Sequence, residues 1–209
     1  MRQTGQRQGM GIMASGELSS AMAERVADLY RRMEQAYDLA AQQLDFTCQG
    51  CPDNCCDSYF LHHTYVEWAY LWVGIGELSA ERRKVLENRA AEYAAACEEA
   101  LAKSERPQIM CPLNEEGRCS LYHHRLMICR MHGVPSSLTF PNGKVQKFPG
   151  CFRCQEIVGD RQAVPTVERA SLFRELVGLE QELLGEQQGQ LPKLKKTIAE
   201  MILSGPPGV

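Results

Sequence analysis

The chain has 209 residues and a formal net charge of -3, and 44% of its residues are hydrophobic. This length and composition suit a globular protein that buries its own core. The charge provides no basic field of the kind that binding to phosphate backbones requires, so nucleic acid is not favoured as a partner. The unusual feature is the cysteine content, which is ten residues.

The use of these cysteines depends on the cellular compartment. The first 16 residues are polar and rich in Gly and Gln, and they contain no apolar segment of the length that a secretory signal needs. No later stretch reads as a membrane span. We therefore expect a cytoplasmic protein with no membrane association, in which closely spaced cysteines are metal ligands more often than disulfides. Residues 1–16 lack periodicity and are expected to form a disordered extension.

Two helices are predicted in the first third of the chain. Apolar residues recur at helical spacing from Leu18 and predict an amphipathic helix that ends near Leu44. A second helix is predicted after Thr64, because Thr64 and Glu67 match a capping box, and it ends near Gly74. Apolar residues occur almost all round this second helix, so we expect it to be buried in the core.

A third helix is predicted from Ala80 to about Lys103, with Ser79 as its N-cap. Cys97 lies on the apolar stripe of this helix, among alanines. A cysteine in such a position acts as a small buried hydrophobic residue, so Cys97 is not counted among the candidate ligands.

The densest cysteine group follows the first helix. Four cysteines lie within nine residues with the spacing C-x2-C-x3-C-C, namely Cys48, Cys51, Cys55 and Cys56. Pro52 and Asn54 predict a turn-rich loop here, whose backbone can wrap around a metal and donate N–H groups to its sulfur ligands. A C-x2-C turn also allows two thiolates to reach one zinc or iron atom.

A second cysteine group follows the third helix. The turn signal at residues 114–117 predicts a hairpin that places Cys111 and Cys119 opposite each other. Cys129 lies on a short predicted helix that Gly133 ends. On one continuous helix Cys119 and Cys129 would be about 15 Å apart, too far for one metal. Either Cys119 precedes the helix or the two cysteines bind different metals.

The last pair, Cys151 and Cys154, forms a second C-x2-C turn. It follows a predicted hairpin over residues 137–148, which turns at residues 141–143. Both cysteines are far from the first group in sequence. They can complete a site with it only if the chain folds back.

Two more helices are predicted over residues 167–184 and 194–203, after which residues 205–209 are expected to fray. The sequence contains no internal repeat and no long linker, and a site formed by its cysteine groups would connect segments from residue 48 to residue 154. We therefore expect one domain over residues 17–204. Its fold class is expected to be mainly α, a helical domain with short β-hairpins and cysteine-rich metal-binding loops.

Counting ligands narrows the chemistry. The nine candidate metal ligands are Cys48, Cys51, Cys55, Cys56, Cys111, Cys119, Cys129, Cys151 and Cys154. One tetrahedral site cannot use them all, so two metal sites fit better, or one multinuclear cluster with spare thiols. Zinc would be a structural staple, whereas an iron–sulfur cluster would add electron transfer or an open iron site. The spacing does not separate these, so the cofactor is expected to be zinc or iron, including an iron–sulfur cluster.

Charged and basic side chains near the cysteines are further candidates. Five histidines lie near the cysteine groups in sequence: His62, His63, His123, His124 and His132. Neutral imidazole binds zinc well, but thiols are in surplus, so we expect the histidines to support ligands or to lie on the surface, and ligation by any of them stays open. Arg125 and Arg130 flank Cys129, where they either offset the negative charge of a thiolate centre or lie on a solvated helix face.

Taken in order, these motifs resemble those of the CxxCxxCC cysteine-cluster family, the YkgJ-like zinc- or iron-chelating domain proteins. The resemblance covers residues 46–154. It rests on C-x2-C-x3-C-C, Cys111-Pro112-Leu113, Cys119-x2-Tyr122 and Arg125-x3-Cys129-Arg130. This chain has three residues between its second and third cysteines where the family name implies two, and it has Leu126 where the family often has proline. The resemblance implies that the cysteines from Cys48 to Cys129, Cys97 excepted, bind the metal.

The family has few assigned reactions, although a related cysteine cluster occurs in flagellin lysine N-methylases. We therefore expect a metal-binding protein that acts as a structural or metal-chelating module, with a metal ion as its partner. The alternative is an iron–sulfur or zinc-dependent modifying enzyme, such as a protein lysine N-methyltransferase. A cavity for S-adenosylmethionine beside the cysteines would favour the enzyme, and closed coordination without such a cavity would favour the module. The usual nucleotide-binding and serine-hydrolase motifs are absent from the sequence.

Overall fold

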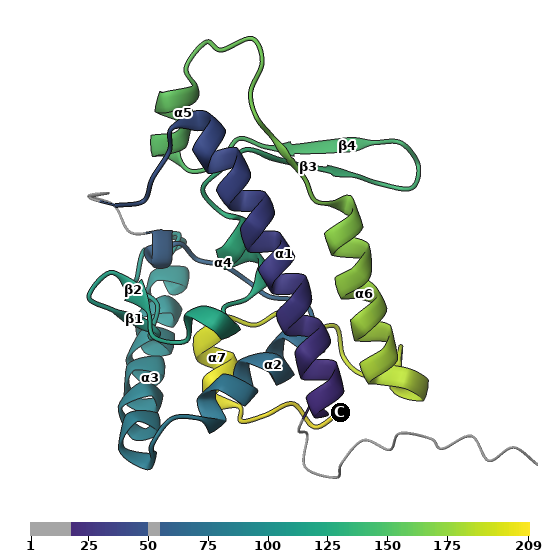
Figure 1. Ribbon diagram of the computed structural model, residues 1–209. Coiled ribbons are helices and arrows are strands. Elements are labelled where there is room, and N and C mark those ends of the chain that lie inside the picture. Colours follow the sequence, from purple (N-terminus) through teal and green to yellow (C-terminus); the bar gives the residue numbers. More distant parts are fainter. Residues whose placement is uncertain (1–17, 50–54) are drawn as a thin grey trace, which may run out of the picture.

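The computed structural model describes residues 18–49 and 55–209. Within these residues the chain is mainly helical, as predicted, with two small sheets (Figure 1). The elements are α1 (Ser20–Leu44), η1 (Cys55–Asp57), α2 (Tyr65–Gly76), α3 (Ala80–Ala102), β1 (Asn114–Glu115), β2 (Arg118–Cys119), η2 (Tyr122–His124), α4 (Met127–Met131), β3 (Ser136–Thr139), β4 (Val145–Phe148), α5 (Phe152–Val158), β5 (Val167–Glu168), α6 (Ala170–Leu184), η3 (Gly185–Gln187) and α7 (Ile198–Leu203). The extension expected over residues 1–16 lies outside the described residues.

The long helix α1 confirms the prediction from apolar spacing and lies beside α6 (Figure 1). The Ser19 hydroxyl accepts a hydrogen bond from the N–H of Met22 and caps its start, while Asp45 ends it in the left-handed conformation. The residues that it buries are Met22, Val26, Leu29, Tyr30, Met33, Ala40, Ala41 and Leu44. The helix delivers the chain to Cys48 at the edge of the core.

The second predicted helix, α2, is buried along most of its length, as its apolar composition predicts. The predicted capping box at its start is wrong, because the Thr64 side chain makes no cap bond. Instead, the carboxylate of Glu180 in α6 accepts hydrogen bonds from the N–H groups of Tyr65 at 2.9 Å and Val66 at 2.7 Å. N–H groups in a first helical turn have no partner within the helix, so a carboxylate from a distant segment can take the place of a local cap.

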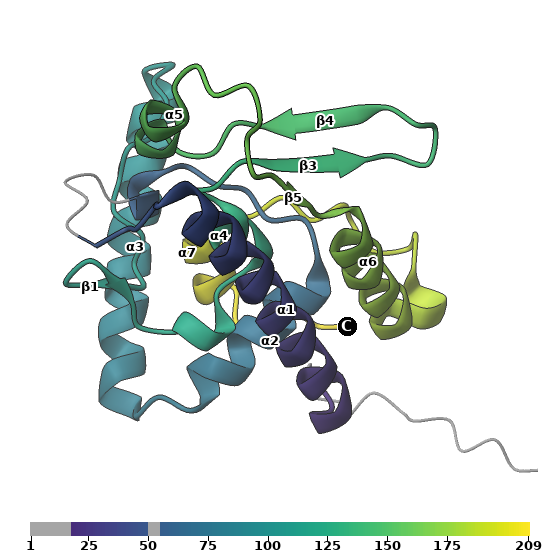
Figure 2. The same ribbon diagram turned by 45° about the horizontal axis from the view of Figure 1, so that its top comes forward.

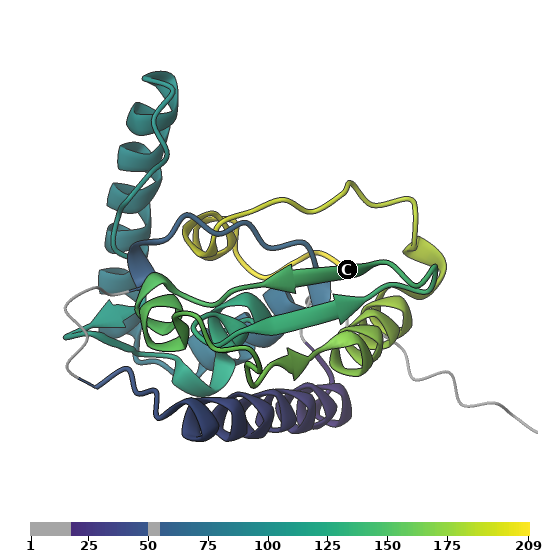
Figure 3. The ribbon, with the colours of Figure 1, turned by 90° about the horizontal axis from the view of Figure 1, so that it is seen from above.

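The third predicted helix, α3, begins as expected, with the hydroxyl of Ser79 accepting a hydrogen bond from the N–H of Arg82. It packs mainly on α7, and one end projects beyond the other helices (Figure 3). Its buried residues are Leu86, Ala90, Tyr93 and Cys97. Cys97 is therefore a packing residue, as the sequence predicts.

The first predicted hairpin is formed by β1 and β2, but its register differs from the expectation. Cys119 lies opposite Asn114 rather than opposite Cys111. Cys111 precedes β1 and lies outside the ladder. The turn signal thus placed the hairpin correctly, while its strands are shorter than the apolar runs suggested.

The second predicted hairpin, β3 and β4, carries a third strand that the sequence pattern does not indicate. β5 pairs with β3 in parallel, so the strand order is β4-β3-β5. Val167 was expected to open a helix, but it belongs to β5, and α6 begins only at Ala170. The hairpin extends away from the helices (Figure 2).

Two expectations about the C-terminal region are wrong. The last helix, α7, begins at Ile198, later than predicted, because Thr197 forms a capping box there. The last residues are packed rather than frayed, since Val209 is buried and the indole N–H of Trp68 donates a hydrogen bond to the carbonyl of Gly205.

Within the described ranges, no helix combines the length and the hydropathy that crossing a membrane requires.

Candidate metal centre

The structure describes every predicted ligand except Cys51, which lies outside the described residues. The described cysteines fall into two neighbourhoods that draw on distant parts of the chain. The first, here called the hairpin thiol set, comprises Cys56, Cys111, Cys119 and Cys129. The second, the α5 thiol set, comprises Cys48, Cys151 and Cys154. Cys55 is assigned to neither set, since the charges of both Cys48 and Cys129 contribute to raising the pKa of its thiol.

The hairpin thiol set is assembled from η1, the segment before β1, β2 and α4. The N–H of Cys111 donates a hydrogen bond to the carbonyl of Cys56 at 2.9 Å, which holds the first cysteine group against the hairpin. Cys119 is the last residue of β2 and precedes the short helix of Cys129, so the first of the two alternatives for this pair is confirmed. The two cysteines therefore do not lie on one continuous helix.

Burial and mutual proximity disfavour the charged forms of three thiols in this set. Burial raises the pKa of Cys111 to about 12, and the neighbouring Cys56 and Cys119 contribute. Burial also raises the pKa of Cys119. The pKa of Cys129 is raised well above its ordinary value by burial and by the thiols of Cys111, Cys119 and Cys56. These three side chains are therefore neutral at pH 7 unless a bound cation replaces their protons.

Cys55 and Cys56 lie in a short 3-10 turn rather than in extended backbone. A hydrogen bond between their side chains lowers the pKa of Cys56 to about 6 and raises that of Cys55. Asn114 and Arg125 also lower the pKa of Cys56. Cys56 is thus a thiolate at pH 7, which is the form that binds metal.

The α5 thiol set lies where the C-terminal end of α1 approaches α5 (Figure 1). Cys151 is the N-cap of α5 and Cys154 lies in its first turn, so the predicted two-cysteine turn is the start of a helix. The hydroxyl of Tyr37 lies 3.7 Å from the sulfur of Cys48. Burial raises the pKa of Cys154 to about 11, with contributions from Cys151 and Cys48. Tyr37 is not among the residues predicted for the site, although it lies one helical turn beyond Met33 on the buried side of α1.

Two arginines adjoin the hairpin thiol set. Arg130 is only 3% exposed, and its guanidinium donates hydrogen bonds to three backbone carbonyls within residues 122–125 and lies over the ring of Tyr30. It has no carboxylate ion-pair partner among the described residues. Arg125 and Arg130 both favour the thiolate form of Cys119, against the effect of burial. For Arg130 the solvated-face interpretation is wrong, because the side chain is a buried cation beside thiols.

The histidines have other neighbours in the described structure. His62 is buried and exchanges two backbone hydrogen bonds with Lys196, and burial lowers its pKa to about 3. The Nδ1 atom of His63 lies 3.0 Å from the carbonyl oxygen of Leu194. The remaining rings, of His123, His124 and His132, pack against Tyr122, Tyr70 and Phe60, respectively.

In the part of the chain that the structure describes, no three His, Cys, Asp or Glu side chains converge closely enough to hold a metal ion. The two thiol sets are therefore neighbourhoods of donors rather than formed coordination shells. Their chemistry is uniform, because every donor is a soft thiol of the kind that zinc and iron prefer. Side-chain rotations would be needed before several of these sulfurs could share one ion.

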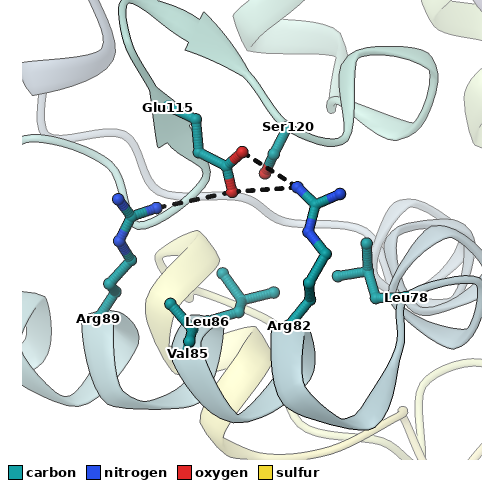
Figure 4. A pocket seen from close by; sticks show the side chains of 7 residues that line it. All are labelled: Leu78, Arg82, Val85, Leu86, Arg89, Glu115 and Ser120. Carbon is teal, nitrogen blue, oxygen red and sulfur yellow. Dashed lines mark hydrogen bonds and ion pairs between the residues drawn. The ribbon is translucent and has the colours of Figure 1, made fainter.

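A small pocket lies between α3 and the β1–β2 hairpin (Figure 4). Glu115 lies between two arginines in it, 3.0 Å from Arg82 and 3.7 Å from Arg89. The volume of this pocket is about 90 Å³.

Comparisons with family models, with curated proteins and with solved structures return no match for this chain. The resemblance to the CxxCxxCC family consequently rests on the order of the cysteine motifs alone.

Proposed function

We propose that this chain is a metal-binding protein in which the hairpin thiol set holds zinc or iron and the α5 thiol set contributes ligands to a second ion. The observation that supports this most strongly is the meeting of thiols from segments more than 50 residues apart, Cys56 with Cys111, Cys119 and Cys129. A single cysteine packs well in a core. Here three buried thiols, those of Cys111, Cys119 and Cys129, lie near the Cys56 thiolate and have raised pKa values, and a bound cation would stabilise their charged forms.

Metal binding at the hairpin thiol set would replace the protons of Cys111, Cys119 and Cys129, because only thiolates are ligands. Four thiolates around a divalent ion leave a net negative charge. The buried guanidinium of Arg130 would offset that charge. The ion would tie η1, the β1–β2 hairpin and α4 together, so its role is structural or chelating.

The metal content is tested by purifying the full chain without oxygen and measuring elements and the absorption spectrum on one sample. A colourless protein with about two zinc ions per chain supports the proposal in its structural form. A brown protein with iron and sulfide supports an iron–sulfur centre, and with it the alternative of a modifying enzyme. A protein that purifies without metal, and that takes up neither Zn²⁺ nor Fe²⁺, would contradict metal binding.

Serine variants test the division into two sets. Cys129→Ser should lose one metal equivalent and Cys154→Ser the other, whereas Cys97→Ser is the matched control and should keep both. Loss of all metal from each of the first two variants would indicate one multinuclear centre instead. Loss from Cys97→Ser would show that the ligand assignment is wrong.

A further inference from the structure

The β3–β4 hairpin presents a strand with an open outer edge. β4 is the outermost strand on its side of the sheet among the described residues. Its residues from Val145 to Lys147 are exposed, and the ribbon extends away from the helices (Figure 2). An exposed edge of this kind can pair with another strand.

The pairing of the hairpin shows which backbone groups of β4 point outward. The N–H of Phe140 donates to the carbonyl of Lys144 at 2.8 Å, so these two residues form a hydrogen-bonded pair. Hydrogen-bonded and non-hydrogen-bonded pairs alternate along an antiparallel ladder. Leu138 and Gln146 are therefore the next hydrogen-bonded pair, and the intervening pairs are not bonded to each other.

The other side of β3 agrees with this assignment. The carbonyl of Ser137 accepts a hydrogen bond from the N–H of Arg169 at 2.9 Å, so it faces β5 and not its cross-strand neighbour Lys147. The same alternation applies to the pair of Thr139 and Val145. The N–H and C=O groups of Val145 and Lys147 consequently point away from the sheet.

The β3–β4 hairpin carries positive charge only. Residues 136–148 contain two lysines, Lys144 and Lys147, and no Arg, Asp or Glu, although the whole chain carries a net charge of -3. Lys144 and Lys147 are exposed and make no ion pair within the described residues. Glu168 on β5 does not neutralise them, since its carboxylate accepts hydrogen bonds from Ser137, Thr139 and the N–H of Ala170.

We propose that β4 binds an acidic, extended segment of a partner protein, which adds an antiparallel strand to the sheet at this edge. The register requires a carboxylate opposite Lys147 and another three residues later, opposite Lys144. An apolar residue between them lies opposite Val145, whose side chain is 49% exposed. The same lysines disfavour pairing with a second copy of β4, because like charges would then face each other. They therefore contribute to specificity for an acidic partner as well as to affinity.

The peptide acetyl-Thr-Glu-Thr-Val-Glu-Thr-amide has this register, and its analogue with both Glu replaced by Lys is the control ligand. Binding is measured by titration and by amide hydrogen exchange of the full chain. We expect added protection of the amides of Val145 and Lys147, and little change at Gln146 and Phe148, which are already bonded to β3. Binding of the acidic peptide without protection at the first two amides would overturn the proposal, as would equal binding of the Lys analogue.

Variants separate the backbone from the charge. Val145→Pro removes an outward N–H without breaking the β3–β4 ladder, and it should abolish binding while leaving the fold unchanged. Lys144→Gln with Lys147→Gln should weaken binding by about tenfold, because each exposed pair contributes modestly. The matched control is Lys84→Gln on α3 with Lys103→Gln at its C-cap, where the side chains are 72% and 58% exposed. Equal loss in this control would show nonspecific attraction and overturn the proposal. None of these measurements depends on bound metal.

Discussion

Glu67 is a carboxylate, only 5% exposed, that joins three parts of the core. It accepts hydrogen bonds from the hydroxyl of Tyr30 at 3.0 Å, from the hydroxyl of Thr64 at 2.6 Å and from the N–H of Met127 at 2.6 Å. The sequence assigned it to a capping box. Its actual role is to connect α1 and α4 to α2, and thereby to hold the helix of Cys129 in place.

Replacing this carboxylate leaves two buried donors, the Tyr30 hydroxyl and the Met127 N–H, and the partly buried Thr64 hydroxyl without this acceptor. We therefore expect Glu67→Ala to lower the free energy of unfolding by about 3 kcal/mol, measured by urea denaturation. The control is Glu87→Ala on α3, where the side chain is 49% exposed and its loss should change stability by less than about 0.5 kcal/mol. Equal effects in the two variants would contradict the linking role.

His62 predicts a pH dependence of stability. Burial holds its pKa at about 3, below the ordinary value of 6.5 for histidine, so the folded state disfavours the charged form. The contribution of neutral His62 to the free energy of unfolding is therefore fully present above pH 6.5 and is lost as the pH falls from 6.5 towards 3. At pH 5 the loss amounts to about 2 kcal/mol relative to pH 7. Urea denaturation of the metal-free protein at several pH values should show this loss, and the free energy of unfolding of the His62→Gln variant should depend less on pH. An equal pH dependence in the variant would contradict the role of His62.

At the scale of elements, the start of α2 depends on α6. Glu180→Gln should weaken the two backbone hydrogen bonds at that end and cost about 1 kcal/mol. Glu182→Gln on the same helix is the matched control. Glu182 makes an exposed ion pair with Arg25 at 2.6 Å, and such pairs contribute about 0–1 kcal/mol. Thermal unfolding would distinguish the two variants, and a Glu182 effect as large as that of Glu180 would refute the distant cap.

The elements that the sequence predicted correctly are those with enough turns to show a period. α1 and α3 each bury one face over many turns, and apolar spacing identifies them. α5 and β5 are too short for any period to appear, and β5 exists because β3 lies beside it. The cap of α2 could not be predicted either, because Glu180 is 115 residues away from Tyr65 in sequence.

At the scale of the whole molecule, the candidate site also depends on contacts between segments that are distant in sequence, which local patterns do not predict. Spacing predicts that the cysteine groups are candidate ligands, and the apolar stripe of α3 correctly predicts that Cys97 is buried in the core. The division into two thiol sets depends on how α5 returns to the end of α1, which no local pattern encodes. Tyr37 beside Cys48 was missed for the same reason.

Metal uptake by the whole chain should release protons. Since the pKa values of Cys111, Cys119 and Cys129 are raised, their thiols are protonated at pH 7, whereas Cys56 is a thiolate. Filling the hairpin thiol set should therefore release about three protons per ion. Because protons compete with the metal, affinity should fall as the pH is lowered. Zinc titration in weak buffer with a pH indicator measures this release, and uptake without it would exclude these thiols as ligands.

The distance along the chain between members of each thiol set also bears on synthesis. Cys48 is made more than 100 residues before Cys151 and Cys154, and a ribosome adds about 5–20 residues per second. The first four cysteines thus leave the ribosome several seconds before their neighbours exist. During that interval they are an exposed cluster of thiols on a nascent chain, open to oxidation or to capture of whichever soft metal is most abundant. A chelator or reductant present during translation, rather than after it, would therefore have the larger influence on how much correctly loaded protein is obtained.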